Sequence, residues 1–218
     1  MALSCVSCRG CIEQDAEKPE AETFRKKVVA WSHDIGIRSE LEEWELRFLE
    51  TQLGKCADSQ LVTDATWIGE ALVVLAWAMG IHDLPPYDQS PLPAHVANSI
   101  GFMKPKAETA LADPRIRAHS ELQHFGDFIF SLHWRLRQFN LDHKPMDFRE
   151  TAKTAWFGPL VIDGMEFVDD DLAVRGVSLS SAEPNLVRAC LSMAVERHRA
   201  ANWLLGYSEV YSETGSDT

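Results

Sequence analysis

The sequence lacks the cysteine content of a protein built on disulfides. It has five cysteines, an odd number, and three of them crowd the first eleven residues, at Cys5, Cys8 and Cys11. Small secreted folds held by disulfides use more cysteines, in pairs. Three thiols at this spacing supply three metal ligands, yet zinc and iron–sulfur sites normally take four, and no fourth cysteine follows nearby. We therefore expect reduced thiols, with a metal site at these three cysteines as the alternative.

Long apolar runs and the common nucleotide and nucleophile motifs are missing as well. No apolar run approaches the roughly 20 residues that cross a bilayer, and the start "MALSCVSCRGC" has no basic region followed by a continuous apolar one. No phosphate loop, Gly-x-Gly-x-x-Gly, Gly-x-Ser-x-Gly or His-Glu-x-x-His motif occurs. The sequence therefore predicts a cytoplasmic protein that uses no cofactor, and it favours a non-catalytic protein over an enzyme.

Basic residues are few compared with acidic ones. There are 21 Lys and Arg against 33 Asp and Glu, which gives a formal net charge of −12. Such a field repels nucleic acid, phosphate-rich ligands and anionic membranes, and it attracts a basic protein. We expect no nucleic acid and no membrane as partners, and a basic protein as the partner.

The apolar residues repeat mainly at helical spacing and make up enough of the chain for a sizeable core. The sequence therefore predicts an all-α, single-domain helical bundle over residues 21–207. A disordered leader (1–20) precedes it, and a polar tail (208–218) follows. Residues 160–180 mix acidic, apolar and glycine residues, which indicates either a short hairpin or an irregular loop.

Five segments have the period of helices, and four of them have a capping residue. The expected caps are Ser39 for the first, Thr63 or Asp64 for the second, Asp113 for the third and Ser180 or Ser181 for the last. The second helix is apolar almost all round, so it is expected to be the buried central helix. The predicted helices cover residues 39–54, 64–80, 114–139, 147–158 and 181–206.

Glu121 and His124 stand three residues apart on the third predicted helix. Di-iron bundles collect ligands with this spacing, but they need a second Glu-x-x-His and two further carboxylates, whereas the pattern occurs once here. His133 projects to the opposite edge of the apolar stripe. We interpret the segment as a packed helix, with a metal site at Glu121 and His124 as the alternative.

Two charges interrupt apolar helix faces. Glu70 is the one charge between Asp64 and His82, and Arg197 falls inside the apolar stripe of the last helix. Because a buried charge needs a counter-charge, we predict a buried ion pair between Glu70 and Arg197. Its role is structural, or it forms the floor of a pocket for an anionic ligand.

Three blocks in fixed order, "WIGEALVVLAWAMGIHDLPPYD", "FIFSLHWRLRQ" and "ERHRAANWLLGY", resemble the bacterial family called domain of unknown function 4272. The resemblance spans residues 67–218 and implies no assigned role for any residue. The shared polar positions of the family correspond to Glu70, His133, Trp134, Arg137, Glu196, Arg197, His198, Asn202 and Trp203.

Two classes of function remain open. The first is a protein that binds another macromolecule, such as a toxin-neutralising or accessory protein, which the acidic charge favours. The second is an enzyme or small-ligand binder with a pocket between the central helix and the last two helices. The candidate catalytic residues of that pocket are Glu70, His133, Arg137, Glu196, Arg197 and His198.

Overall fold

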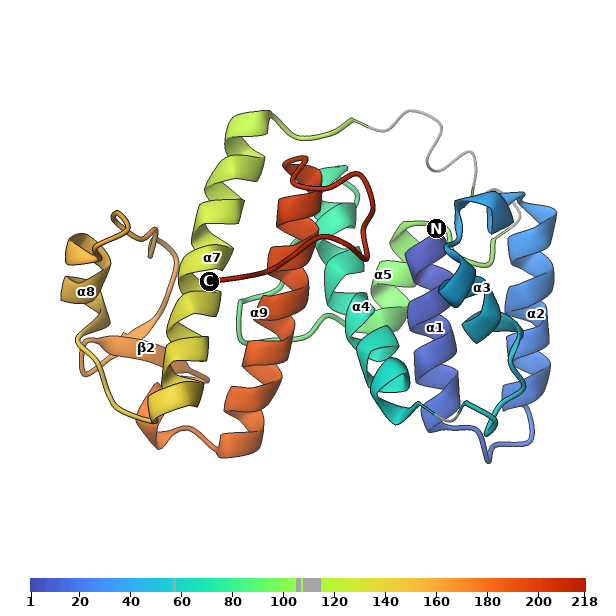
Figure 1. The fold of residues 1–218 in the computed structure, drawn as a ribbon, viewed down its shortest axis with the longest axis horizontal. Coiled ribbons are helices and arrows are strands. Elements are labelled where there is room, and N and C mark those ends of the chain that lie inside the picture. Colours follow the sequence, from blue (N-terminus) through green and yellow to red (C-terminus); the bar gives the residue numbers. More distant parts are fainter. Residues whose placement is uncertain (57, 105–106, 108–114) are drawn as a thin grey trace. The chain divides into compact units, whose positions relative to one another are not determined.

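The computed structural model divides the chain into two compact units (Figure 1). Unit 1 comprises Met1–Asp83 and Pro91–Arg115, and unit 2 comprises Leu84–Ser90 and Ile116–Thr218. Both units are mainly helical, so the predicted fold class is confirmed, but the chain forms two units where a single domain was expected. The residues that the structure describes are 1–56, 58–104, 107 and 115–218.

Unit 1 packs its first helix, α1, along α4, with α2 and α3 beside α1 (Figure 1). Residues 2–14 were expected to be disordered and are instead α1, with Cys5 and Val6 fully buried. α1 and α4 approach closely at Gly10, where an added Cβ would lie 2.8 Å from the backbone nitrogen of Thr66. The absence of a side chain at Gly10 therefore allows this packing. The elements are α1 (Ala2–Gln14), α2 (Ala21–Asp34), η1 (Ile37–Glu40), α3 (Glu43–Glu50), α4 (Ser59–Ala78) and α5 (Pro93–Ser99).

The buried helix predicted from residue 64 onward is α4. It starts earlier than expected, because the Asp58 side chain accepts hydrogen bonds from the backbone nitrogens of Gln60 (2.9 Å) and Leu61 (3.1 Å). By length and composition α4 is apolar enough to cross a membrane, which corrects the expectation that no segment is. The core helix of a soluble protein has the same composition, so this property alone does not locate the protein.

The helix expected after Ser39 starts later. Ser39 lies in η1, and the cap of α3 is Glu42, whose backbone nitrogen donates to Glu45 Oε2 at 2.8 Å in a capping box. At the other end, the buried Arg25 guanidinium donates to the carbonyl oxygen of Leu49 at 2.9 Å. Because a charged donor stabilises the carbonyls at the end of a helix, Arg25 ties α2 to α3.

Unit 2 is built around two long helices, α7 and α9, which lie side by side (Figure 1). α7 begins at His119, and Arg115 to Ala118 are not helical; the expected cap at Asp113 lies outside the described residues. α9 is capped by Glu183, whose side chain accepts from the Asn185 nitrogen at 2.8 Å. The elements are α7 (His119–Asp142), α8 (Phe148–Thr154), β1 (Phe167–Val168), β2 (Asp171–Val174), β3 (Val177–Ser178), η2 (Leu179–Ser181) and α9 (Pro184–Leu204).

The three strands form an antiparallel sheet in the order β1-β2-β3. The hairpin alternative for residues 160–180 is therefore correct, and a third strand extends it. Two-residue turns connect the strands, at Asp169–Asp170 and at Arg175–Gly176, and all four residues have positive φ. Such turns match the right-handed twist of paired strands, which is why they join hairpins.

A buried ion pair joins the sheet to α7. Arg135 Nε donates to Asp171 Oδ1 at 2.7 Å and an Nη atom donates to Oδ2 at 2.6 Å, and both side chains are almost fully buried. The Asp171 carboxylate also accepts from the backbone nitrogens of Met146 (3.0 Å) and Leu172 (2.8 Å). The bidentate geometry and the extra donors compensate both charges for the loss of water.

Candidate functional site

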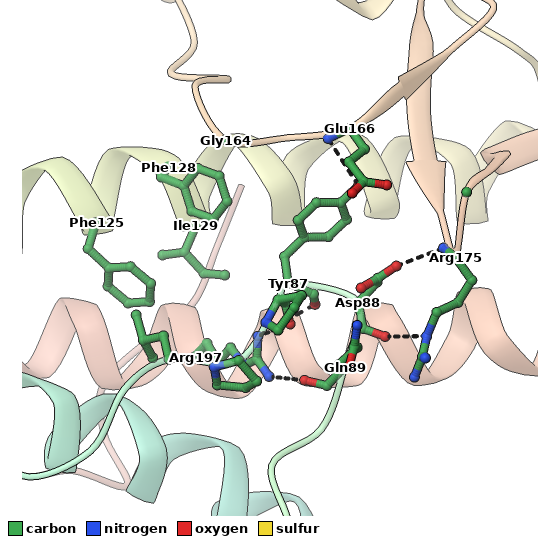
Figure 2. Close-up of a pocket in the computed structure, with 14 residues that line it drawn as sticks. Tyr87, Asp88, Gln89, Phe125, Phe128, Ile129, Gly164, Glu166, Arg175 and Arg197 are labelled. Atoms are coloured by element: carbon green, nitrogen blue, oxygen red, sulfur yellow. Dashed lines mark hydrogen bonds between the residues drawn. The ribbon is translucent and has the colours of Figure 1, made fainter.

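The site in unit 2 is built on the segment Leu84–Ser90, "LPPYDQS", which we call the strap. Its two consecutive prolines favour extended backbone, so the strap runs without helix or strand across unit 2 (Figure 2). Tyr87 fixes the strap to the sheet: its hydroxyl donates to the Ala173 carbonyl oxygen at 2.6 Å and accepts from the Glu166 nitrogen at 3.3 Å. Burial raises the pKa of Tyr87 to about 12, so the hydroxyl stays protonated at neutral pH.

Asp88 fixes the strap to the turn between β2 and β3. Its carboxylate accepts from the backbone nitrogen of Arg175 at 2.7 Å, and its carbonyl oxygen accepts from Arg175 Nε at 3.1 Å (Figure 2). Asp88 is buried, whereas Arg175 is exposed, and the two Nη atoms of Arg175 have no hydrogen-bond partner among the described residues. The turn therefore presents the outer edge of a guanidinium to solvent.

Arg197, a predicted site residue, holds the strap from α9. Its side chain is buried, and an Nη atom donates to the carbonyl oxygen of Gln89 at 2.7 Å (Figure 2). Longer contacts reach the carbonyl oxygens of Pro86 (3.4 Å) and Tyr87 (3.5 Å). The planar guanidinium suits this role, because it carries several donors in a fixed fork.

The strap borders an open pocket of about 810 Å³, the strap pocket. Phe125, Phe128 and Ile129 of α7 form an apolar wall, and Glu166 and Arg175 form a charged rim (Figure 2). The described lining contains no His, Cys, Ser, Thr or Lys, and the polar side chains of Tyr87, Asp88 and Arg197 are engaged in holding the strap. The lining therefore combines an apolar wall with two charged side chains, a carboxylate and a guanidinium.

His133 and His198, also predicted site residues, form a pair elsewhere in unit 2. Their Nδ1 atoms lie 3.1 Å apart, and both rings are buried. Burial lowers the pKa of His133 to about 4, with further lowering by His198 and Arg137, and burial likewise lowers the pKa of His198 to about 4. Both rings are therefore neutral at pH 7, so one Nδ1 donates and the other accepts.

The polar tail packs against unit 2 near this pair. The Asn202 side chain donates to the Gly215 carbonyl oxygen at 2.9 Å, and the Arg137 guanidinium donates to the carbonyl oxygen of Thr218. A hydrogen bond that the His198 ring donates to the backbone of Ser216 and the charge of Asp217 partly oppose the lowering of the His198 pKa. The last residues therefore run across α9 to α7 (Figure 1), and Ser216 and Asp217 lie close to His198.

The five predicted catalytic residues of unit 2 do not share one pocket. Arg197 lines the strap pocket, whereas His133, His198 and Arg137 lie at the tail, and Glu196 pairs with Arg199 at 2.6 Å. Glu70 is buried in unit 1, and Arg197 belongs to unit 2, so the ion pair between them stays a prediction.

The predicted metal ligands have other surroundings. Glu121 accepts from the Ala118 nitrogen (3.2 Å) and from Arg117 (3.1 Å) at the start of α7, and His124 is exposed. Within the described ranges, no three His, Cys, Asp or Glu side chains are grouped to hold a metal ion.

The three N-terminal cysteines lie on α1. Burial raises the pKa of Cys5 and of Cys8 to about 12, and it also raises the pKa of Cys11, so all three remain thiols at neutral pH. Metal binding and nucleophilic attack require the thiolate. Cys8 and Cys11 line a small apolar pocket of unit 1, of about 290 Å³.

Sequence analysis missed most of the strap pocket. Tyr87 and Asp88 stood only at the end of the first block that resembles the family, and Arg175 only in the segment assigned to a hairpin or loop. The available signal was the run "PPYD", in which prolines restrict the backbone beside residues that form strong hydrogen bonds.

Comparison with known proteins identifies the family. The profile described as Domain of unknown function (DUF4272) matches residues 1–152. The chain belongs to the DUF4272 family. The DUF4272 match includes α1, the strap and α7, so it begins well before residue 67, where the resemblance in the sequence begins, and it ends before the third block at 196–207. No curated protein and no solved structure matches the chain.

Proposed function

We propose that this DUF4272 protein is a non-catalytic binding protein of the cytoplasm, and that its strap pocket receives a segment of a basic partner protein. One observation carries the proposal. The polar side chains of Tyr87, Asp88 and Arg197 hold the strap in place, and the groups left toward the pocket are a phenyl wall and the charges of Glu166 and Arg175. A preformed wall lowers the entropic cost of binding.

The chemistry of the lining fits a peptide with an apolar residue next to a basic one. Phe125 and Phe128 offer an apolar surface, with ring centroids 6.5 Å apart, and aromatic side chains supply much of the energy of protein interfaces. Glu166 is exposed at the rim and offers a carboxylate to a Lys or Arg. The net charge of −12 would speed the approach of a basic partner.

A small organic ligand is the second candidate. The observation that favours it is the volume of about 810 Å³, within the range of roughly 300 to 1,000 Å³ that small-molecule sites occupy. The pocket is open, however, and an open surface is also what a partner protein needs. The two candidates predict different products when a photoreactive group replaces Phe128: a protein adduct for the first and a small-molecule adduct for the second.

Photocrosslinking tests the proposal. p-Benzoylphenylalanine would replace Phe128 in the pocket wall or, as the matched control, the exposed Leu141 on the same helix. We expect a discrete protein adduct at position 128 and none at 141. The adduct should weaken in Glu166→Lys and at high salt, because both remove the attraction of the rim for a basic residue. Equal adducts at both positions would contradict the proposal, and a small-molecule adduct at 128 would favour the second candidate.

A further inference from the structure

Unit 2 holds a second pocket, of about 700 Å³, whose walls are aromatic. We call it the aromatic pocket and define it by Phe130, Trp134, Trp156 and Phe157, with Asp127 at its edge. Phe157 contacts the other three rings at centroid distances of 6.1, 5.8 and 5.4 Å, with interplanar angles of 82°, 57° and 89°. Because the rings are steeply inclined to one another, their faces point in different directions around the pocket.

The side chains that line the aromatic pocket carry charge of one sign. Asp127 is the only charged side chain in the described lining, and it is exposed. Its Oδ1 accepts from Gln123 Nε2 at 2.9 Å, which leaves Oδ2 with no hydrogen bond from the described chain. Arg137 lies near this end of unit 2, but it donates to the Thr218 carbonyl oxygen and does not line the pocket. The pocket therefore combines a carboxylate with aromatic rings and has no cation of its own.

Elsewhere the chain places its own cations over aromatic faces. The Arg149 guanidinium lies 3.9 Å from the ring centroid of Phe167, and that of Arg135 lies 5.5 Å from Phe139. The four rings of the aromatic pocket carry no such contact within the described part of the chain. Trp134 stacks one face on Phe148, at a centroid distance of 6.1 Å and an interplanar angle of 21°. No cation of the described chain occupies the remaining ring faces, which bear negative charge density and attract cations.

Trp156 gives the pocket an accessible wall. Its side chain is 94% exposed, although tryptophan is among the largest apolar side chains. Its edge-on contact with Phe157, at 89°, supports the ring beside the pocket. A cation entering there would be covered by an indole face that otherwise meets only water, so binding would bury apolar surface and add cation–π attraction.

We propose that the aromatic pocket binds an organic ammonium cation. The alkyl groups of the cation would contact the faces of Trp134, Trp156 and Phe157, and the Asp127 carboxylate would balance its charge. The inference is independent of the proposed function, because it concerns another pocket and its test needs no partner protein.

Choline is the probe, and 3,3-dimethylbutan-1-ol is its uncharged control of the same shape. The full chain would be labelled with 5-fluorotryptophan, and the ¹⁹F resonance of Trp156 would be identified by its loss in Trp156→Phe. We expect choline to shift that resonance saturably and to bind at least about fivefold more tightly than the alcohol, because only choline gains cation–π attraction. Equal binding of the two probes would overturn the proposal.

Variants separate the contributions of the indole ring and of the carboxylate to choline binding. Binding of choline, measured by calorimetry, should fall about tenfold or more in Trp156→Leu and stay within about threefold in Trp156→Phe, which keeps a ring face. Asp127→Asn should weaken binding several-fold, whereas Tyr207→Leu, at another exposed aromatic residue, should not change it. Because Trp156 is exposed, these changes leave folding intact. Unchanged binding in Trp156→Leu would contradict the proposal.

A last comparison identifies the source of the cation. A short peptide with one trimethyllysine would be titrated beside choline. Tighter binding of the peptide would assign the site to a side chain of a polypeptide, and tighter binding of choline would assign it to a free small molecule; both support an ammonium site. The absence of saturable binding by either probe would overturn it, without bearing on the strap pocket.

Discussion

His133 Nδ1 and His198 Nδ1 lie 3.1 Å apart across α7 and α9, in rings that are both buried. A contact between two ring nitrogens requires that one carries a proton and the other does not. Protonation of both rings would place two positive charges side by side in the core and remove the hydrogen bond. The pair is therefore a structural element that depends on neutral histidines.

Acid is expected to destabilise unit 2 through this pair. The pKa of each histidine is lowered to about 4 in the folded chain and returns to its ordinary value, near 6.5, on unfolding. The unfolded state therefore binds more protons between these values, so stability is complete above about pH 6.5 and falls as the pH drops toward 4. We expect a loss of about 1.4 kcal/mol per pH unit for each histidine, measured by urea unfolding.

His133→Leu should remove part of this dependence and lower stability at pH 7 by about 1 to 3 kcal/mol, because His198 loses its partner. His124→Gln, at an exposed histidine of the same helix, is the control and should keep the full dependence. A pH profile that is unchanged in His133→Leu would show that the pair does not titrate as the structure indicates.

Asp171→Asn should lower the free energy of unfolding by about 3 to 5 kcal/mol. The substitution removes the charge that balances the buried Arg135 guanidinium and leaves that cation in the core. Asp170→Asn is the matched control one residue away, because the Asp170 carboxylate is exposed and lies 3.5 Å from an exposed Arg149. Its effect should stay within about 0.5 kcal/mol. Chemical denaturation measures both variants. Similar losses in the free energy of unfolding would contradict the role of Asp171 as the counter-charge of Arg135.

Gly10→Ala tests whether α1 is part of the fold of unit 1. The new Cβ would lie 2.8 and 2.9 Å from backbone atoms of Thr66 and Ala65, which cannot move as a side chain does. We expect a loss of about 1 to 3 kcal/mol, although alanine by itself favours a helix. Gly69→Ala on α4 is the control, because its Cβ would meet only Ser7 Oγ, at 3.4 Å. Thermal unfolding should distinguish them, and equal melting temperatures would argue against the packing of α1 on α4.

Arg197→Lys should loosen the strap. Lysine has one charged nitrogen and cannot reproduce the fork of donors that reaches Gln89 and its neighbours. We expect amide hydrogen exchange to quicken about tenfold or more at Gln89 and at Arg175, whose nitrogens donate to Pro86 O and Asp88 Oδ2. The control is Arg188→Lys, at an exposed position of α9. Unchanged exchange in Arg197→Lys would mean that Tyr87 and Asp88 hold the strap without it.

Burial of α1 illustrates a limit of sequence patterns. Its buried positions include Ser4, Arg9 and Gly10, which no apolar period marks, so the segment was expected to be disordered. Arg9 is buried because it pairs with Glu13 and donates to the Thr51 carbonyl oxygen at 3.1 Å. Glu13 lies on the same helix, whereas Thr51 lies at the end of α3. The contact with Thr51 therefore forms only when the chain folds.

The sequence alone determined the helices α4, α7 and α9, because apolar residues at helical spacing act within a few turns of the chain. It also determined the acidic charge, which depends on composition only. The tertiary structure decided which polar side chains meet. His133 contacts His198, Arg135 pairs with Asp171, and Arg197 binds the strap. These partners are tens of residues apart, so their meeting depends on how loops return and helices pack, which no local period records.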